Sequence, residues 1–143
     1  MHTFRFITLA LLACTLVLSA EAQKKVNYRL AKPARVQYGT ASFYADKFNG
    51  RRTANGEIFS QEKMTAAHNT LPLGTWIRVT NLRNQRSVVV RINDRLHPNN
   101  PRIVDLSKKA ARKLGYTGHG LTRVKVEVMT KKEAELALAV ANN

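Results

Sequence analysis

From Val36 to Met129 the chain consists of short apolar runs, rich in β-branched residues, that are separated by glycine, asparagine and proline. This punctuation is typical of strands joined by turns, and it predicts a mainly β fold of the barrel or sandwich type. Five strands are expected at 37–44, 63–67, 75–81, 87–92 and 122–129, and residues 103–106 are a candidate sixth.

Two of the expected strands alternate between apolar and other residues. In the run 75–81 Ile77 and Val79 occupy every second position, and in the run 122–129 valine does the same. Successive side chains of a strand point to opposite faces, so each run should bury one face and expose the other.

Capping signals predict two short helices. The segment 107–115 begins with a serine that can cap a first turn and ends with a glycine that can terminate it. The segment 130–141 begins with threonine, followed three residues later by glutamate, which is a capping-box pattern. Within it Leu136 and Val140 lie one turn apart, and we expect them to dock on the barrel.

The first residues are typical of a secretory signal. Arg5 provides a positive start, residues 7–18 are apolar, and Ala20-Glu21-Ala22 is a small-x-small cleavage site. We therefore expect a signal peptide at 1–22, a polar flexible tether at 23–35 and one domain at 36–143. About 120 residues suffice for a single core.

Cys14 suggests an alternative processing of this signal segment. Residues 11–14 resemble the lipobox at which bacterial lipoproteins are cut and acylated, but a chain cut there would begin with the apolar residues 15–18, whereas lipoprotein tethers are usually polar. We therefore expect export to the periplasm or the medium rather than anchoring through Cys14. The domain itself has no cysteine, so it forms no disulfide.

The net charge of +15 favours a polyanionic partner. In an exported protein the first polyanions met are the cell wall and the anionic envelope lipids, with which peripheral contact is expected. Nucleic acid is a rival, but the basic residues are dispersed and no nucleic-acid motif accompanies them. A solvated basic surface without a dedicated ligand also fits the charge.

Five motifs follow in order within residues 39–114: Thr53-Ala54-Asn55-Gly56-Glu57, Thr65-Ala66-Ala67-His68, Leu71-Pro72-Leu73-Gly74-Thr75, Asn93-Asp94-Arg95 and Ile103-Val104-Asp105-Leu106-Ser107. Together they resemble the rare lipoprotein A (RlpA-like) family. The resemblance implies a six-stranded double-psi β-barrel. It also implies a monomer in the bacterial envelope that acts without a cofactor on peptidoglycan glycan strands.

The activity implied is that of an endolytic lytic transglycosylase, which cleaves the MurNAc-GlcNAc bond and forms 1,6-anhydroMurNAc, with strands poor in stem peptides as the expected substrate. Asp94, Glu57 and His68 match the family's active-site groups. Asp94 is the candidate acid and base, which protonates the glycosidic oxygen and then takes the proton of the muramic acid 6-hydroxyl. Burial after the strand 87–92 should keep its acid form available. Alternatively, Asp94 pairs with Arg95 or caps a turn.

Glu57 and His68 have supporting roles in this interpretation. Glu57 follows the turn-forming Asn55-Gly56 and would set the proton affinity of Asp94 and hold sugar hydroxyls; the alternative is a solvated loop glutamate. The ring of His68 would hydrogen-bond Asp94 or the developing oxyanion, although a lone histidine at a strand end is often structural.

Other side chains are candidates for binding the glycan. Tyr44 and Phe48 flank a loop and can stack on sugar rings, while Asn55 and Arg95 can hold polar groups of the glycan. Asp105 is expected to anchor the turn into the segment 107–115. The scattered histidines and the lack of a cysteine pair predict no metal site.

The chain departs from the family pattern directly after Arg95. Many members have Gly-Pro-aromatic where this chain has Leu96-His97-Pro98, which bears on substrate fit. A non-catalytic, expansin-like module that binds wall polysaccharide is therefore the alternative function, because fold alone does not separate the two. A third reading, a basic protein that binds anionic lipid or nucleic acid, rests on charge alone.

Overall fold

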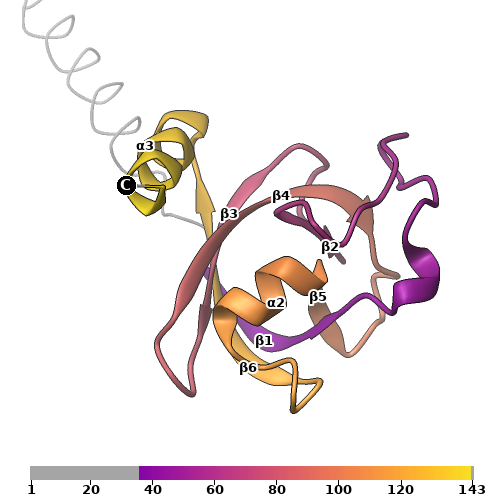
Figure 1. Ribbon diagram of the computed structural model, residues 1–143, viewed down its shortest axis with the longest axis horizontal. Coiled ribbons are helices and arrows are strands. Elements are labelled where there is room, and N and C mark those ends of the chain that lie inside the picture. The colour runs from indigo at the N-terminus through magenta and orange to yellow at the C-terminus, as the bar shows by residue number, and fades with distance from the viewer. Residues whose placement is uncertain (1–35, 143) are drawn as a thin grey trace, which may run out of the picture. The chain divides into compact units, whose positions relative to one another are not determined.

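The computed structural model describes residues 36–142, which form a closed six-stranded barrel with two α-helices (Figure 1). The predicted signal peptide and tether lie outside the described residues. The strands are β1 (Val36–Phe43), β2 (Thr65–His68), β3 (Trp76–Asn81), β4 (Ser87–Arg95), β5 (Arg102–Leu106) and β6 (Thr122–Met129). The predicted mainly β class and the sixth strand are both confirmed.

The barrel closes in the order β1-β5-β2-β4-β3-β6. Two strand pairs, β1 with β5 and β2 with β4, are parallel, and the other four are antiparallel. Each parallel pair has a register shift, at Thr40/Ala41 and at Ala66/Ala67 respectively. The antiparallel contact of β2 with β5 joins the two parallel pairs, which gives the double-psi barrel that the family resemblance implied.

One strand is longer than its pattern predicted. β4 continues three residues beyond the expected run 87–92, because Ala67 pairs with Asp94 and His68 pairs with Arg95. Asp94 therefore lies within a strand and not after one. The apolar pattern stops at Ile92 because Asn93 and Asp94 are polar, whereas the backbone ladder depends on the neighbouring strand and not on side-chain polarity.

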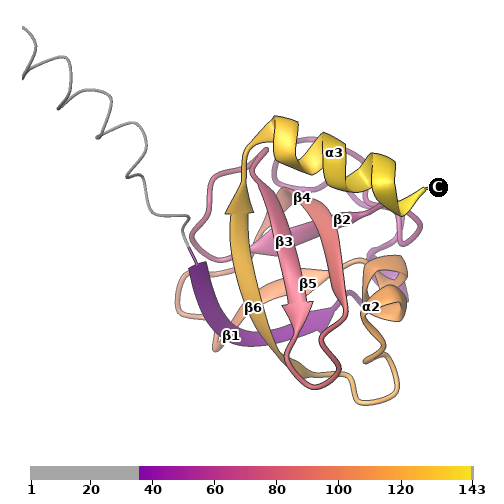
Figure 2. The same ribbon diagram turned by 90° about the vertical axis from the view of Figure 1, so that its left-hand side faces the viewer.

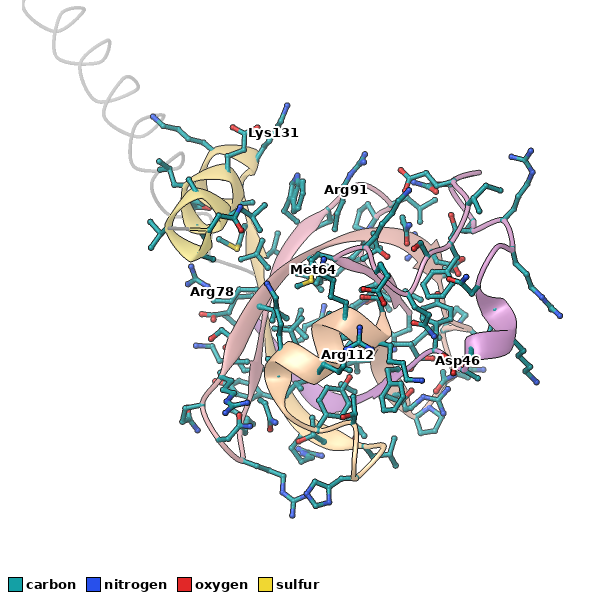
Figure 3. The ribbon with its side chains drawn as sticks, viewed as in Figure 1. Asp46, Met64, Arg78, Arg91, Arg112 and Lys131 are labelled. Carbon is teal, nitrogen blue, oxygen red and sulfur yellow. The ribbon has the colours of Figure 1, made fainter. Side chains whose placement is uncertain are left out.

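The predicted alternation is confirmed in β3 and β6. Ile77 and Val79 of β3 and Val124 and Val126 of β6 are fully buried. Side chains of all six strands meet in the barrel, and Met64, which is labelled in Figure 3, packs against them from the loop before β2. The strands contribute these core residues: Ala41, Ala66, Ile77, Val79, Val88, Val90, Ile92, Val104, Leu106, Val124 and Val126.

Helix α2 (Lys108–Leu114) covers the end of the barrel that faces the viewer in Figure 1. Both predicted caps are confirmed: the hydroxyl of Ser107 accepts a hydrogen bond from the backbone of Ala110, and Gly115 ends the helix with a φ of 74°. Only glycine adopts that left-handed conformation without strain. The inner face of α2 is fully buried and seals the core.

Helix α3 (Lys131–Ala141) lies against the outside of the barrel beside β3 and β4 (Figure 2). Its predicted capping box is present. The predicted docking face is wrong, because Leu136 and Val140 are 60% and 78% exposed, while Ala134 is buried. Apolar residues occupy most positions from 134 to 141, so the spacing did not single out one face, and the small Ala134 allows the closest approach. No helix in the described part is both long and apolar enough to cross a membrane.

Two leucines provide a matched test of this packing. Leu114 at the end of α2 is fully buried, whereas Leu136 on α3 is mostly exposed. We expect Leu114→Ala to lower the free energy of unfolding by about 2–5 kcal/mol, because it leaves a cavity in the core. Leu136→Ala should change it by less than about 0.5 kcal/mol. Urea unfolding of the purified variants measures both, and equal losses would contradict the packing of the two helices.

Candidate active site

A groove of about 750 Å³ lies where β1, β4 and β5 end, beside the short helix η1 (Asp46–Phe48). Four of the predicted site residues line it, namely Asp94, Tyr44, Phe48 and Arg95, whereas Glu57, His68 and Asn55 do not. The lining residues are Ser42, Phe43, Tyr44, Ala45, Lys47, Phe48, Arg51, Arg52, Phe59, Asp94, Arg95, Leu96, Arg102 and Asp105.

The carboxylate of Asp94 is half-buried and accepts three hydrogen bonds. Its Oδ1 accepts from the backbone N–H groups of Ala54 and Arg95, each at 2.9 Å. Its Oδ2 accepts from the hydroxyl of Tyr44 at 2.6 Å. Arg95 thus contacts Asp94 through its backbone, while its guanidinium donates to the carbonyl oxygens of His68 and Leu71. Both oxygens of the carboxylate are held in place within the groove.

Tyr44 is oriented by its ring and by its hydroxyl. The ring packs on Phe59, with 4.3 Å between the centroids, and meets Phe48 edge-on at 5.8 Å. Burial, and then the hydrogen bond to Asp94, raise the pKa of the phenol far above its ordinary value. The hydroxyl therefore remains a proton donor to Asp94. Sequence reasoning assigned Tyr44 to sugar stacking and missed this contact.

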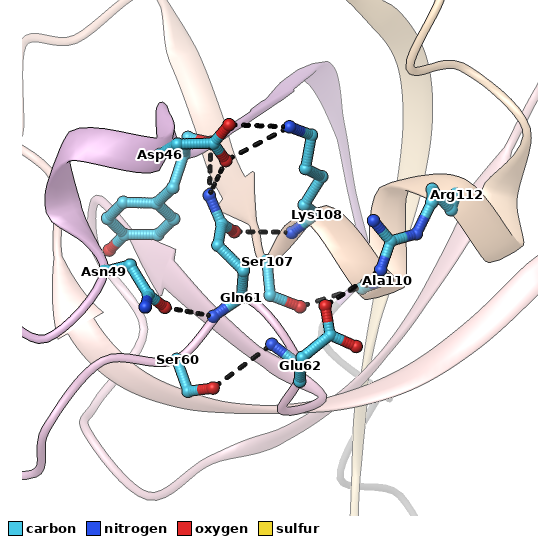
Figure 4. Close-up of polar contacts among 10 residues, drawn as sticks. Asp46, Asn49, Ser60, Gln61, Glu62, Ser107, Lys108, Ala110 and Arg112 are labelled. Atoms are coloured by element: carbon cyan, nitrogen blue, oxygen red, sulfur yellow. Dashed lines mark hydrogen bonds and ion pairs between the residues drawn. The ribbon is translucent and has the colours of Figure 1, made fainter.

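Gln61 fixes the backbone of Tyr44 (Figure 4). The side-chain Nε2 of Gln61 donates to the carbonyl of Tyr44 at 2.8 Å and to Asp46 at 3.3 Å, while its Oε1 accepts from the backbone N–H of Lys108 at 2.8 Å. The backbone N–H of Gln61 donates to Asn49. These hydrogen bonds connect the wall of the groove to the first turn of α2. Gln61 is buried, so they are shielded from water. No motif in the sequence had indicated it.

The loop 53–57 supplies the Ala54 N–H that reaches Asp94. Within the loop, Asn55 Oδ1 accepts from the hydroxyl of Thr53 and from the backbone of Glu57. Gly56, with a φ of 88°, allows the tight turn. The Asn55 side chain therefore stabilises the loop through its Oδ1, and its predicted contact with glycan stays a prediction. The backbone N–H of Asn55 donates to the carbonyl of Asn93, and this hydrogen bond holds the loop against β4.

The carboxylate of Glu57 holds the same loop to β4. It accepts from Asn93 Nδ2 at 3.1 Å and lies 3.5 Å from Arg91, a residue of β4 labelled in Figure 3. The hydrogen bond from Asn93, with a smaller contribution from the Arg91 charge, lowers the pKa of Glu57. No hydrogen bond joins Glu57 to Asp94 among the described residues. Its predicted influence on Asp94 would therefore be exerted through the loop.

His68 is fully buried, and no hydrogen bond joins its ring to Asp94 among the described residues. Its Nδ1 accepts from the backbone N–H groups of Thr70 and Leu71, each at 3.1 Å. Burial, and then the positive charge of Arg95, lower its pKa to about 4. Within the described part of the chain its Nε2 has no hydrogen-bond partner. The ring thus shapes the turn whose Leu71 carbonyl binds Arg95, and the predicted catalytic role of His68 stays a prediction.

A second carboxylate, that of Asp105, also lines the groove. It accepts from the hydroxyl of Ser42 and from Arg102, whose Nε lies 3.0 Å away. The predicted role of Asp105 as an anchor for the turn into α2 was wrong, because these are its side-chain partners and it lies within β5. An acidic residue inside the apolar run 103–106 was the available signal. The described residues contain no group of three or more side chains suited to holding a metal ion.

The buried His68 predicts a pH dependence of stability. Its folded-state pKa of about 4 lies below the ordinary 6.5, so the unfolded chain binds the proton first as the pH falls. The contribution of His68 is therefore complete above pH 6.5 and is lost between pH 6.5 and 4, by about 3 kcal/mol in total. Urea unfolding across this range should show the loss. The variant His68→Asn should not show this loss, because the Asn Oδ1 can accept the same backbone hydrogen bonds without titrating. If the free energy of unfolding fell equally with pH in wild type and variant, the loss would not arise from His68.

Comparison with known proteins shows the family of this chain. The family described as lytic transglycolase matches residues 36–126. The endolytic peptidoglycan transglycosylase RlpA of Pasteurella multocida is 56% identical over 91 residues, which are 64% of this chain and 31% of that protein. RlpA of Pseudomonas aeruginosa strain UCBPP-PA14 is 57% identical over 89 residues, 62% of this chain and 26% of that protein. The chain thus spans about a third or less of the length of these two relatives.

A solved structure shows the same fold at low identity. The apo expansin of Clavibacter michiganensis superposes with a TM-score of 0.56 and is 19% identical, covering 68% of this chain and 52% of that one. At this identity the likeness concerns the fold alone. The family match, in contrast, extends over more than half of the chain and includes all five motifs, from Thr53 to Ser107. This chain therefore belongs to the RlpA-like lytic transglycolase family of double-psi β-barrels.

Proposed function

We propose that this chain is an endolytic peptidoglycan lytic transglycosylase that cleaves the MurNAc-GlcNAc bond with formation of 1,6-anhydroMurNAc. The observation that carries the proposal is Asp94, a carboxylate that lines the groove and is held by three hydrogen bonds. The names of the relatives support the same activity. A protein with this substrate acts in the bacterial cell envelope.

The mechanism requires one group that serves first as an acid and then as a base. Protonated Asp94 would give its proton to the glycosidic oxygen, and the resulting carboxylate would accept the proton of the muramic acid 6-hydroxyl as that hydroxyl attacks the anomeric carbon. Because the nucleophile belongs to the substrate, no second carboxylate has to activate water. Asp94 is protonated again when the ring closes, so the cycle returns to its start.

The surroundings of Asp94 suit this role. When the proton leaves, negative charge develops on the carboxylate, and Tyr44 and the two backbone N–H groups already point at its oxygens. Donors that are in place before charge develops stabilise the transition state without reorganisation. The pKa of Tyr44 is raised, which keeps its hydroxyl a donor throughout.

The charge of the groove supports a polyanionic glycan. Lys47, Arg51 and Arg52 line it in addition to the two arginines already bonded within the site. The ring of Phe48 is 36% exposed, and the Lys47 and Arg51 charges each lie 5.5 Å from its centroid. Glycan without stem peptides carries a free carboxylate on each muramic acid, so a basic groove fits the proposed preference for strands poor in stem peptides.

A module that binds wall glycan without cutting it is the second candidate. The observation in its favour is Leu96, which lines the groove and belongs to the segment that departs from the family pattern. An altered lining beside the acid can preserve binding while it misplaces the scissile bond, since small displacements of the substrate cost large factors in rate.

Product analysis separates the two candidates. We expect the purified protein to release anhydromuramyl products from peptidoglycan, and more from glycan stripped of stem peptides, as detected by mass spectrometry. Asp94→Asn keeps the size of the side chain but cannot donate an acid proton, so the rate should fall by roughly 10²- to 10⁴-fold. The control is Glu127→Gln, which makes the corresponding change at a carboxylate of β6 outside the groove lining; its rate should match that of wild type. Binding to sacculi with no product from wild type would favour the second candidate.

Replacing Tyr44 tests the proposed partner of the acid. Tyr44→Phe keeps the ring packing but removes the hydrogen bond to Asp94. The loss of one such bond to a charged group predicts a kcat lower by roughly 10- to 100-fold with little change in KM. Tyr38→Phe, at an exposed position of β1 outside the groove lining, is the matched control. A raised KM with unchanged kcat would instead place the Tyr44 hydroxyl on the sugar.

A further inference from the structure

The strand register places a second polar set on the same face as Asp94. Ser42 pairs with Asp105, Asp105 pairs with Ala67, and Ala67 pairs with Asp94. Paired residues of neighbouring strands project to the same face of a sheet. Two strand spacings, about 10 Å, therefore separate the backbones at Asp105 and Asp94. Ser42 lies one strand farther along the same row, and all three polar residues line the groove.

This set is fixed by its own hydrogen bonds. The hydroxyl of Ser42 donates to Asp105 Oδ1, and Arg102 donates from Nε to Oδ1 at 3.0 Å and from Nη2 to Oδ2 at 3.3 Å. The carboxylate of Asp105 is only 12% exposed. The backbone carbonyl of Ser42 accepts from the hydroxyl of the buried Tyr116 at 2.8 Å. The groups are therefore held in place before any ligand arrives.

Asp105 is poorly suited to proton transfer, because the Arg102 guanidinium holds both of its oxygens. Its effect is on its neighbours. A serine hydroxyl has one proton, and Ser42 gives it to Asp105, so the Ser42 oxygen can only accept a further hydrogen bond. Arg102 has five N–H donors, and the two bonds to Asp105 leave others available. The set thus presents an acceptor and a donor side by side.

A secondary amide is the complementary ligand, because its N–H donates and its C=O accepts. We propose that Ser42, Asp105 and Arg102 form a subsite that binds the acetamido group of an N-acetylated sugar, on a ring neighbouring the one that Asp94 contacts. Ser42 accepts the amide N–H, and Arg102 donates to the amide oxygen. This subsite rests on the proposed function, in which wall glycan is the ligand, and it makes N-acetylation a determinant of binding.

The test is a binding cycle with two proteins and two substrates, in an Asp94→Asn background that prevents cleavage. Calorimetry gives the affinity for soluble stem-peptide-free glycan strands and for the same strands after enzymatic de-N-acetylation. Ser42→Ala should bind N-acetylated strands about fivefold more weakly, the effect of one neutral hydrogen bond, and should not change the affinity for de-N-acetylated strands. The new amine charge on the latter affects both proteins equally and cancels in the comparison.

Control variants keep the result interpretable. Ser87→Ala removes a strand serine outside the groove lining and should change neither affinity. Ser42→Thr retains the hydroxyl and should retain the preference for N-acetylated strands. If Ser42→Ala fails to fold by thermal unfolding, Arg102→Lys, which keeps the charge beside Asp105 but loses the forked donors, should show the same selective loss.

Two results would overturn the subsite: equal loss of affinity for both substrates, or no loss for either. These outcomes are independent of the proposed activity, because the cycle measures binding without cleavage. Absence of anhydromuramyl products from wild type would refute the transglycosylase while leaving the cycle readable. If Ser42→Ala did not selectively weaken the binding of N-acetylated strands, the subsite would be refuted, while the product analysis would be unaffected.

Discussion

The double pairing of β2 is the constraint on which the site depends. Ala67 pairs with Asp94 on one side, in the parallel ladder with β4, and with Asp105 on the other, in the antiparallel ladder with β5. A strand register that slipped by one residue would turn one of the two carboxylates away from the groove. The register shift at Ala66/Ala67 is therefore part of the site, since it sets which residue of β4 lies beside Ala67.

The matching residues of the family motifs work at different distances from the groove. Asp94 lines it, whereas Glu57 fastens the loop that gives Asp94 a backbone donor, and His68 shapes the turn that receives the Arg95 guanidinium. Residues that recur together in a motif can thus serve one carboxylate through the backbone. Tyr44, which belongs to none of the five motifs, touches that carboxylate directly.

Much of the fold could be predicted because its signals are local. The alternation around Ile77 and Val79 and the serine cap at residue 107 depend on neighbours in the chain, and both were confirmed. The end of β4 and the inner face of α3 could not be predicted, because each depends on a partner distant in sequence. The Tyr44–Asp94 and Ser42–Asp105 contacts were hidden for the same reason, since they join residues 50 and 63 positions apart.

The closure of the barrel has a consequence for its synthesis. β1 pairs along its length with β6, from Val36 opposite Glu127 to Ala41 opposite Thr122, and β6 also pairs with β3. Until β6 has been made, β1 and β3 each present an unpaired edge, and such edges invite pairing with other chains. Because so many contacts are distant in sequence, closure is also expected to be slow. A chain that stops before residue 122 would therefore be prone to aggregate. By pairing with β1 and β3, β6 removes the two open strand edges through which incomplete chains would associate.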